Sequence, residues 1–514
     1  MKFLLILPAR LIFYIYPDMK KQRVQFLIII SSFFLIAYFL QGLFVLDPDF
    51  GWHVRIGEII AKNGIPYTDP LSYTMPSYPF VSHEWLVDLI TYHIYPTVGL
   101  FGLAFVYGLI ALSALLLQII RKSKKWAVLP LFLSGIVLLS FAGIRPQVIS
   151  WFFFSLLLFI IFTKRFSVYK YFLPLLFALW ANVHGGFAVG IVVLGIYFLC
   201  NTWEKKKIVV TDIIIFFLSV LATGVTPYGY RVWWEIWTSL SDSSLRWSIQ
   251  EWMPAVFVFQ PALWIFVTLA FGLYIKYRKR LSTAEQVLPI VLFLMGLSSI
   301  RHMPFWILCM LPVTAKTIEF FYEDAVKFQF GASRFTKAYI GLSIIAGAFV
   351  LPELYGAYVS FHQDKITYPE KAVVFLHEHP SSGNMFSTYE WGGYLDWKLP
   401  GKKVFIDGRM PSWRWKAPEN EENNAFQTYK DIFAEKMPFI KIQKKYSIDT
   451  VLLHRPGKMK KSTIYGQIDT FVSNKLLHQK SESEFNFAKQ LKAAGMRKMY
   501  EDDVSVIYRI KSRY

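Results

Sequence analysis

The chain has 514 residues, of which 54% are hydrophobic, 18% aromatic and 18% charged, with a formal net charge of +20. The charged share is lower than the roughly one quarter that is usual for soluble domains, which favours a membrane protein. The basic residues lie in short clusters between apolar runs, as in cytoplasmic loops that face anionic lipids, and this pattern argues against a nucleic-acid partner. The cysteines, Cys200 and Cys309, both lie in apolar runs, so no disulfide or Cys-based zinc framework is predicted.

The first apolar run, residues 24–45, is long enough to cross a hydrocarbon core of about 30 Å. Lys20, Lys21 and Arg23 precede it and place that end in the cytoplasm by the positive-inside rule. Residues 1–23 are therefore predicted to be a cytoplasmic or interfacial segment. The sequence that follows the run, beginning at Asp47, emerges on the outer face.

Hydropathy predicts about eleven membrane spans in chain order. They are 24–45, 98–120, 126–143, 148–162, 172–182, 188–203, 208–223, 262–275, 287–300, 304–320 and 339–354. When the spans alternate in direction, the basic clusters at 121–125, 164–165, 204–207 and 276–280 all fall on the cytoplasmic side. We therefore predict a transmembrane domain over 24–355, with a first external loop at 46–97.

After residue 356 the composition becomes that of a soluble domain. Helical patterns are predicted near 369–378, 434–445 and 485–494, and strands at 384–387, 403–406, 450–453 and 504–510. Strands that alternate with helices indicate a small α/β domain, and the span count places it outside the membrane. The predicted fold is an α-helical polytopic membrane protein with a C-terminal extracytoplasmic α/β domain over 356–514.

The first external loop opens with Asp47-Pro48-Asp49 and continues to His53. If a helix begins at Pro48, Asp49 and His53 are four residues apart and share a face, which suits a carboxylate base beside an imidazole. Structural roles explain the same acids, because Asp47 can cap the helix and Asp49 can favour its N-terminus. The spacing does not choose between the two aspartates.

Further along this loop, Ser82 is a candidate cap for a second helix that lies in the membrane interface. His83 and Glu84 would then lie in its first turn, as structural groups or as substrate contacts. Together with Asp47, Asp49 and His53, they offer oxygen and imidazole ligands that could hold Mg²⁺ or Mn²⁺, although nothing in the sequence requires a metal.

The run DPDFGWHVRIGEIIAKNGIPYTDPLSYT (47–74) and HEWL (83–86) resembles the first external loop of polytopic proteins of the GT-C glycosyltransferase superfamily. That superfamily includes protein mannosyltransferases that use dolichyl-phosphate mannose, and aminoarabinose transferases. Similar signatures recur over most of the chain: NVHGGF (182–187), TPYG (226–229), EW (251–252), RHMPF (301–305) and YEWGGYLDW…VFIDGR (389–409).

This resemblance implies transfer of a sugar from a polyprenyl-phosphate donor to a hydroxyl of a glycan, lipid or protein acceptor. It implies an essential acid in the first external loop, Asp47 or Asp49, with His53 beside it. The enzyme would be a multi-pass protein of the cytoplasmic (plasma) membrane, surrounded by membrane lipids, with its C-terminal domain outside.

The departing phosphate of such a donor carries negative charge that positioned cations would stabilise. The candidates at outer span ends are Arg145, His184, Arg301 and His302. Arginine also snorkels to membrane boundaries, which is the structural alternative for both arginines.

In the outer domain, Glu390, Asp407 and Arg409 are candidate substrate contacts. Glu390 and the Trp-Gly-Gly-Tyr after it are loosely similar to the Trp-Asp-Tyr-Gly signature of oligosaccharyltransferases, while a tight turn and a strand end explain the same residues.

Three other functions remain open. An oligosaccharyltransferase, glycan ligase or polymerase would use a lipid-diphosphate donor. A transporter or lipid flippase would more typically show repeated halves, broken helices and ionisable groups near mid-membrane. A non-catalytic sensor domain on a membrane anchor would not require so many spans.

Overall fold

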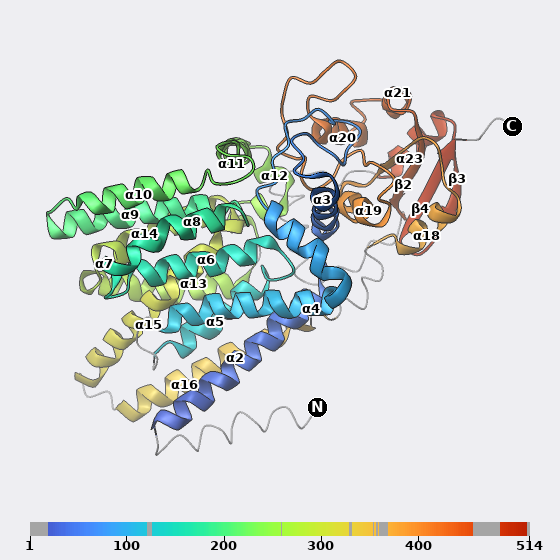
Figure 1. Ribbon diagram of the computed structural model, residues 1–514. Coiled ribbons are helices and arrows are strands. Elements are labelled where there is room, and N and C mark those ends of the chain that lie inside the picture. Colours follow the sequence, from blue (N-terminus) through green and yellow to red (C-terminus); the bar gives the residue numbers. More distant parts are fainter. Residues whose placement is uncertain are drawn as a thin grey trace, which may run out of the picture.

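The computed structural model describes residues 19–510, except 121–125, 259, 328–331, 353, 356–357, 359–367 and 456–483. The chain forms a bundle of apolar helices with a smaller α/β part at one end of it (Figure 1). Most of the predicted N-terminal segment (1–18) and the basic cluster at 121–125 lie outside the described residues.

Each predicted span coincides with an apolar helix. These helices are α2 (Met19–Phe44), α4 (Trp85–Ile120), α5 (Val128–Leu139), α6 (Pro146–Ile161), α8 (Leu173–Ala181), α9 (Phe187–Lys205), α10 (Val210–Ala222), α13 (Pro261–Tyr277), α14 (Thr283–Ser298), α15 (Met303–Lys327) and α16 (Ala332–Ala348). Within the described residues, four helical segments are long and apolar enough to cross a membrane, namely Trp85–Ile119, Phe187–Lys205, Ile300–Val326 and Ser333–Pro352. Several shorter apolar helices accompany them. The chain is a multi-pass membrane protein.

The structure changes the interpretation of the segment before the second span. The helix begins at Trp85 and runs into the span, with a break at Gly99, whose φ is +61°. Ser82 lies two residues before Glu84, which directly precedes this helix, and the Ser82 hydroxyl donates to Asp88 Oδ2 at 2.9 Å. The predicted cap is therefore misplaced, whereas the separate helix before the span is present, because the non-helical Gly99 divides α4 into two helices.

The outer part is built on a mixed four-stranded sheet with the order β1-β2-β4-β3. Strand β1 (Asn384–Ser387) is parallel to β2 (Ile448–His454), while β4 (Ser505–Ile510) is antiparallel to both β2 and β3 (Met496–Glu501). Helices accompany these strands: α18 (Glu370–Glu378), α19 (Gly392–Lys398), α20 (Ala425–Phe433), α21 (Phe439–Lys445) and α23 (Glu484–Ala493).

Three predictions for this part were wrong. The segment 403–406 is no strand of the sheet, since Val404 makes only an isolated parallel bridge to Ser72. The helix predicted over 434–445 is split, because Glu435 has a φ of +59° and α21 begins only at Phe439. Strand β3 was missed because it lies at the sheet edge and exposes most of its side chains, which removes the alternation of apolar residues.

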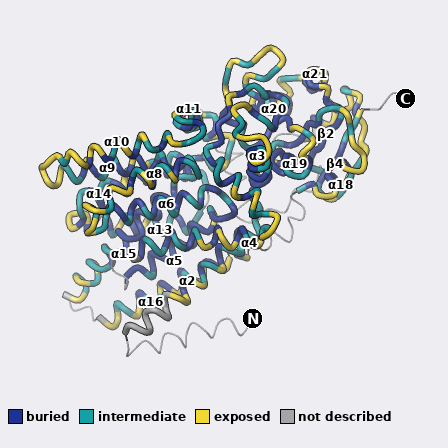
Figure 2. Tube along the Cα trace, viewed as in Figure 1, coloured by how far each residue is buried: buried dark blue, intermediate teal, exposed yellow. Residues whose placement is uncertain are grey.

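Both faces of the sheet are covered, and the first external loop supplies part of the cover. Val451 and Val506 pack into one core, while their neighbours Leu452 and Ile507 pack into another, as the two-residue period of a strand requires. The first of these cores also contains Trp52 and other residues of α3 (Phe50–Asn63). The loop and the C-terminal domain therefore share one hydrophobic core, and Figure 2 shows this junction as largely buried.

Close backbone contacts join α3 to α19, which lie side by side in Figure 1. A Cβ atom at Gly51 would lie 2.0 Å from the carbonyl oxygen of Gly393. A Cβ atom at Gly393 would lie 2.6 Å from the carbonyl oxygen of Pro48. Both positions therefore accept hydrogen only, and Gly393 of the outer motif packs against the first loop, whereas Gly392 packs against Ile406 and Asp407.

Gly51→Ala is expected to destabilise the protein by about 1–3 kcal/mol, the usual cost of forcing extra atoms into a packed core. Loosened contact between loop and domain should also increase proteolysis of the outer domain. Thermal unfolding in detergent and limited proteolysis measure the two effects. Gly401→Ala is the matched control because nothing lies within 4 Å of its added Cβ; equal stability of the two variants would contradict the packing argument.

Candidate functional site

A cavity of about 400 Å³ lies where the helical bundle meets the outer domain. Its polar lining comes from the first loop, the start of α6, the helices and turns before α13, the start of α15 and the outer domain. The charged or titratable residues that line it are Asp47, Asp49, His53, His83, Glu84, Arg145, Glu235, Glu251, Arg301, Tyr389, Glu390 and Arg409. Distant sequence segments thus converge on a single cavity. Of the residues predicted for the site, His184, His302 and Asp407 are not in its lining.

Asp47 is committed to an ion pair. Its carboxylate contacts the Arg145 guanidinium, and its other oxygen accepts the Asp49 backbone N–H at 2.8 Å. Arg145 also pairs with Glu251 at 2.6 Å, so two carboxylates share one guanidinium. Asp47 therefore binds Arg145 and stabilises the turn before α3. The N-cap of that helix is Asp49 and not Asp47.

Asp49 occupies the N-cap position of α3, but its side chain makes no capping hydrogen bond. Its carboxylate lies against the backbone of Gly408, where an added Cβ would be 1.9 Å from Oδ1. Burial, followed by the charge of Asp47, raises the pKa of Asp49 to about 7. Among the described residues this carboxylate has no ion-pair partner, so it is available for proton transfer near neutral pH.

His53 is held between two carboxylates. Its Nδ1 lies 2.6 Å from Asp88 Oδ1, and its Nε2 lies 3.6 Å from Glu84 Oε2. Burial alone would lower the pKa of His53, but Asp88, Glu84 and Asp49 together raise it to about 9. His53 is therefore an imidazolium at neutral pH, with Asp88 fixing the orientation of its ring.

Glu84 lies within reach of three imidazoles. Besides His53, His83 Nε2 lies 3.5 Å and His184 Nε2 lies 3.4 Å from Glu84 Oε1. Burial would raise the pKa of Glu84, but these histidines lower it below its ordinary value. Glu84 is therefore a carboxylate whose charge is balanced from several sides.

The neighbours of His184 fix its tautomer. Its Nδ1 accepts the backbone N–H of Gly186 at 2.9 Å and lies 2.7 Å from the hydroxyl of Ser150, which itself accepts the Trp180 indole N–H. Burial lowers the pKa of His184 to about 3, so the ring is neutral and its proton is on Nε2, the nitrogen that faces Glu84. His184 thus supports Glu84 from behind the cavity wall.

These residues do not fit a divalent cation. In the part of the chain that the structure describes, His83, Glu84 and His184 bring ligand atoms within 4.8 Å of one another, whereas the predicted set of Asp47, Asp49 and His53 does not. A histidine that binds a metal through Nε2 carries its proton on Nδ1 and donates it to a neighbour. In His184 the Nδ1 atom accepts the Gly186 N–H instead, so the proton is on Nε2 and no lone pair there is free for a metal. Mg²⁺ and Mn²⁺ also prefer oxygen ligands over imidazole.

Arg301 is the cation of the cavity that has no carboxylate partner among the described residues. It belongs to the short turn Ile300–His302 before α15, and its guanidinium lies 4.3 Å from the centre of the Trp252 ring. The adjacent His302 lies outside the lining, with no hydrogen-bond partner for its Nδ1 in the described chain. Of this predicted pair, only the arginine faces the cavity.

The outer domain contributes Glu390 and Arg409 to the lining. Arg409 is held by Asp407, with contacts at 2.6 and 3.0 Å, and by Asp69 at 2.9 Å. Asp407 is fully buried and orients this arginine from behind the lining. Glu390 lies 3.4 Å from His454 and keeps a largely exposed side chain.

Sequence reasoning missed the role of three acids. Glu251 was seen only as part of a Glu-Trp motif, although it shares Arg145 with Asp47. Asp88 lies four residues after Glu84, a spacing that could have placed both on one helical face. Glu235 is a lone acid within an aromatic stretch, and no local signal could have directed it to the cavity.

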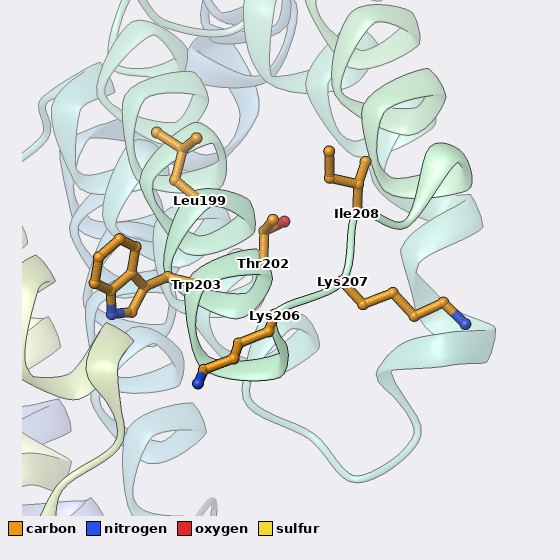
Figure 3. Close-up of a pocket in the computed structure, with 6 residues that line it drawn as sticks. All are labelled: Leu199, Thr202, Trp203, Lys206, Lys207 and Ile208. Carbon is orange, nitrogen blue, oxygen red and sulfur yellow. The ribbon is translucent and has the colours of Figure 1, made fainter.

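A second hollow of about 430 Å³ lies at the turn between α9 and α10, at the end of the bundle far from α3 (Figure 3). Its lining is Leu199, Thr202, Trp203, Lys206, Lys207 and Ile208. Its lining contains neither an acidic side chain nor a histidine, so it carries no candidate chemistry.

Comparison with known proteins gives a single kind of likeness. No protein-family model matches the chain, and no curated protein sequence matches it. Among solved structures, the chain is similar to the crystal structure of ArnT from Cupriavidus metallidurans bound to undecaprenyl phosphate, a GT-C aminoarabinose transferase. The match covers 96% of this chain and 98% of that chain, with 11% sequence identity and a TM-score of 0.46. At this identity and TM-score the likeness carries no argument about the superfamily of this chain or about the role of any residue.

Because the histidine and carboxylate donors are engaged with one another, removal of divalent metal is expected to leave activity unchanged. Glycosyl transfer measured before and after EDTA treatment and dialysis tests this expectation. A loss of about tenfold or more that added Zn²⁺, Mn²⁺ or Mg²⁺ restores would show that His184 adopts the other tautomer and binds metal.

Proposed function

We propose that the protein is a GT-C-type glycosyltransferase that moves a sugar from a polyprenyl-phosphate donor to an acceptor hydroxyl at the outer membrane face. The observation that carries the proposal is the cavity shared by Asp49 and Arg301, a carboxylate and a guanidinium that each lack an ion-pair partner among the described residues. Glu235 is a second carboxylate of the lining without such a partner, and burial raises its pKa as well. The proposed reaction needs a base that takes the proton of the acceptor hydroxyl and a cation that binds the donor phosphate.

Asp49 is the proposed general base. Attack on the anomeric carbon requires a group that takes the proton of the acceptor hydroxyl, and such a base works best when its pKa is near the working pH. The pKa of Asp49, about 7, meets that requirement. Asp47 is less suited because its carboxylate is occupied by Arg145.

Arg301 is the proposed partner of the donor phosphate. The leaving phosphate gains negative charge in the transition state, and a preorganised guanidinium stabilises that charge strongly where water is excluded. The Trp252 ring supports Arg301 without neutralising it. Arg145 is already shared by two carboxylates, so we assign it to holding Asp47 and Glu251 in place.

The position of the cavity favours transfer over transport. The charged groups gather at the end of the bundle and are covered by the outer domain, whose Tyr389, Glu390 and Arg409 line the same space. A transporter or flippase would need ionisable groups along a path through the bundle. In the proposed reaction the outer-domain residues are the ones that meet the acceptor.

Asp49→Asn is expected to lower kcat/KM by about 10²–10⁴-fold, the usual contribution of a general base. In the unaltered enzyme, kcat/KM should rise with pH through an apparent pKa near 7, because Asp49 acts when ionised. Initial rates with polyprenyl-phosphate sugars across pH 5–9, roughly the range that brackets that pKa, test both statements. A wild-type profile that is flat across pH 7 would remove Asp49 as the base.

The same variant should not lose stability. Because the pKa of Asp49 is higher in the folded protein than in an unfolded chain, its ionisation costs stability as pH rises from about 4 to 7. The melting temperature of Asp49→Asn at pH 8 should therefore equal or exceed that of the wild type. A clear fall in melting temperature would mean that Asp49 is structural and that the lost activity reports misfolding.

Arg301→Ala is expected to lower kcat by about 10²–10³-fold, as loss of a transition-state anion contact does. Arg301→Lys should recover part of the rate, because it keeps the charge without the bidentate geometry. Arg497→Ala, an exposed arginine of β3, is the matched control. Activity of Arg301→Ala equal to that of the control would refute the phosphate assignment.

A further inference from the structure

The helix α11 (Arg231–Ser241) has two unlike faces. Its inner face buries Val232 and places Glu235 and Ser239 in the lining of the cavity. Its outer face carries Tyr230, just before the helix, and Trp234 and Trp237, which are 82%, 68% and 65% exposed. The spacing of four and three residues sets these rings on one side of the helix. A single helix thus separates the cavity from a row of uncovered aromatic rings.

This helix is held firmly at both ends. The Trp233 indole N–H donates to the hydroxyl of Thr223, the residue after α10, at 2.8 Å. At the other end, Asp242 pairs with Arg414 of the outer domain at 2.7 Å. Figure 1 shows α11 next to the end of α10 and close to the outer part. The exposed rings therefore do not belong to a loose segment, and their position relative to the bundle is fixed.

The outer face of α11 continues the exposed surface of α10, and the residue types change between them. On α10 the large exposed side chains are Val210, Ile213, Ile214, Phe217, Leu218 and Leu221. On α11 and just before it, the large exposed side chains are Tyr230, Trp234, Trp237 and Leu240, so aromatic rings predominate there. Aliphatic side chains suit the hydrocarbon core, whereas tyrosine and tryptophan collect at the level of the lipid headgroups. The change therefore marks the boundary of the hydrocarbon layer between α10 and α11.

We propose that α11 lies in the headgroup layer of the membrane leaflet, with Tyr230, Trp234 and Trp237 against lipid and Glu235 and Ser239 toward the cavity. The occupant of this face is the bilayer itself. A helix is about 10–12 Å across, so the cavity stands one helix away from the lipid at headgroup depth. An amphiphile can then place its polar head in the cavity while its apolar chain stays in the leaflet. This last step rests on the proposed lipid-linked donor, whereas the depth of α11 does not.

The depth is measured with spin labels on the full chain in lipid nanodiscs. Trp234→Cys is labelled in a background in which the buried Cys200 and Cys309 are replaced by alanine. Phe217→Cys on α10 is the hydrocarbon control, and Val374→Cys on α18 is the aqueous control. Relaxation by oxygen and by a water-soluble nickel chelate should place position 234 between the two controls, about 15 Å from the bilayer centre.

Each other outcome overturns the proposal. Accessibility at position 234 equal to that at 374 would mean that α11 faces water or another protein. Accessibility equal to that at 217 would place α11 within the hydrocarbon, and the cavity would then lie too deep for a headgroup. Neither reading depends on catalysis, so an inactive protein would sink the proposed transfer reaction without deciding the depth of α11.

Kinetics test the link between this face and the donor. The double variant Trp234→Ser/Trp237→Ser should raise KM for a long-chain polyprenyl-phosphate sugar roughly tenfold, because two apolar rings leave the interface, with kcat little changed. For a water-soluble donor with a short prenyl chain, KM should stay the same. Trp203→Ser, which is 79% exposed beside the hollow at the other end of the bundle, is the matched control. Equal effects on both donors would overturn the proposed link.

Discussion

The contact between the first external loop and the outer domain determines the rest of the site. Gly51 and Gly393 meet without side chains, and Gly408 lies directly on the carboxylate of Asp49. Because backbone takes the place of water there, the carboxylate is desolvated, and this is the first cause of its raised pKa. A domain that is distant in the sequence thus sets the acidity of a group at the end of the first span.

Most of the remaining charges of the cavity form balanced groups, with Glu235 as an exception among the described residues. Arg145 is shared by Asp47 and Glu251, and Arg409 by Asp407 and Asp69. Buried charges are costly unless they are paired, so these groups can be understood as structure. The Asp49 carboxylate and the Arg301 guanidinium share the cavity without such partners and are more informative. No ion pair within the fold offsets the free-energy cost of burying their charges. In the proposed reaction, Asp49 and Arg301 find their partners only when substrates bind.

Much of the helical part could be predicted, and much of the site could not. Each span predicted from an apolar run coincides with a helix, because the length and hydropathy of a run are local properties of the sequence. Alternation of the basic clusters also placed His83, Arg145 and Arg301 toward one end, where they do line a common cavity. The division of labour between Asp47 and Asp49 depends on Arg145 and Gly408, which lie far away in the sequence. No spacing within the loop could have supplied it.

The glycine motifs show a similar limit. The Trp-Gly-Gly-Tyr sequence after Glu390 suggested a tight turn, which is a local interpretation. The structure assigns Gly393 to contact with the backbone of Pro48, a role that exists only once two domains meet. The tautomer of His184 could not be predicted from local sequence either, because it depends on contacts of Nδ1 with Gly186 and with Ser150 of another helix.

The proposed depth of the cavity agrees with the energetics of the proposed lipid-linked substrate. Moving a prenyl chain out of the bilayer costs about 0.8 kcal/mol for each buried CH₂ group, so a long chain cannot be lifted to a site in water. The catalytic groups must instead be brought to the headgroup. Helix α11, with aromatic rings on one face and Glu235 on the other, does this by joining the end of α10 to the outer domain through Thr223 and Asp242. The outer domain then closes the cavity from the aqueous side, where an acceptor hydroxyl arrives. The two substrates of the proposed reaction can therefore meet without either leaving its own phase.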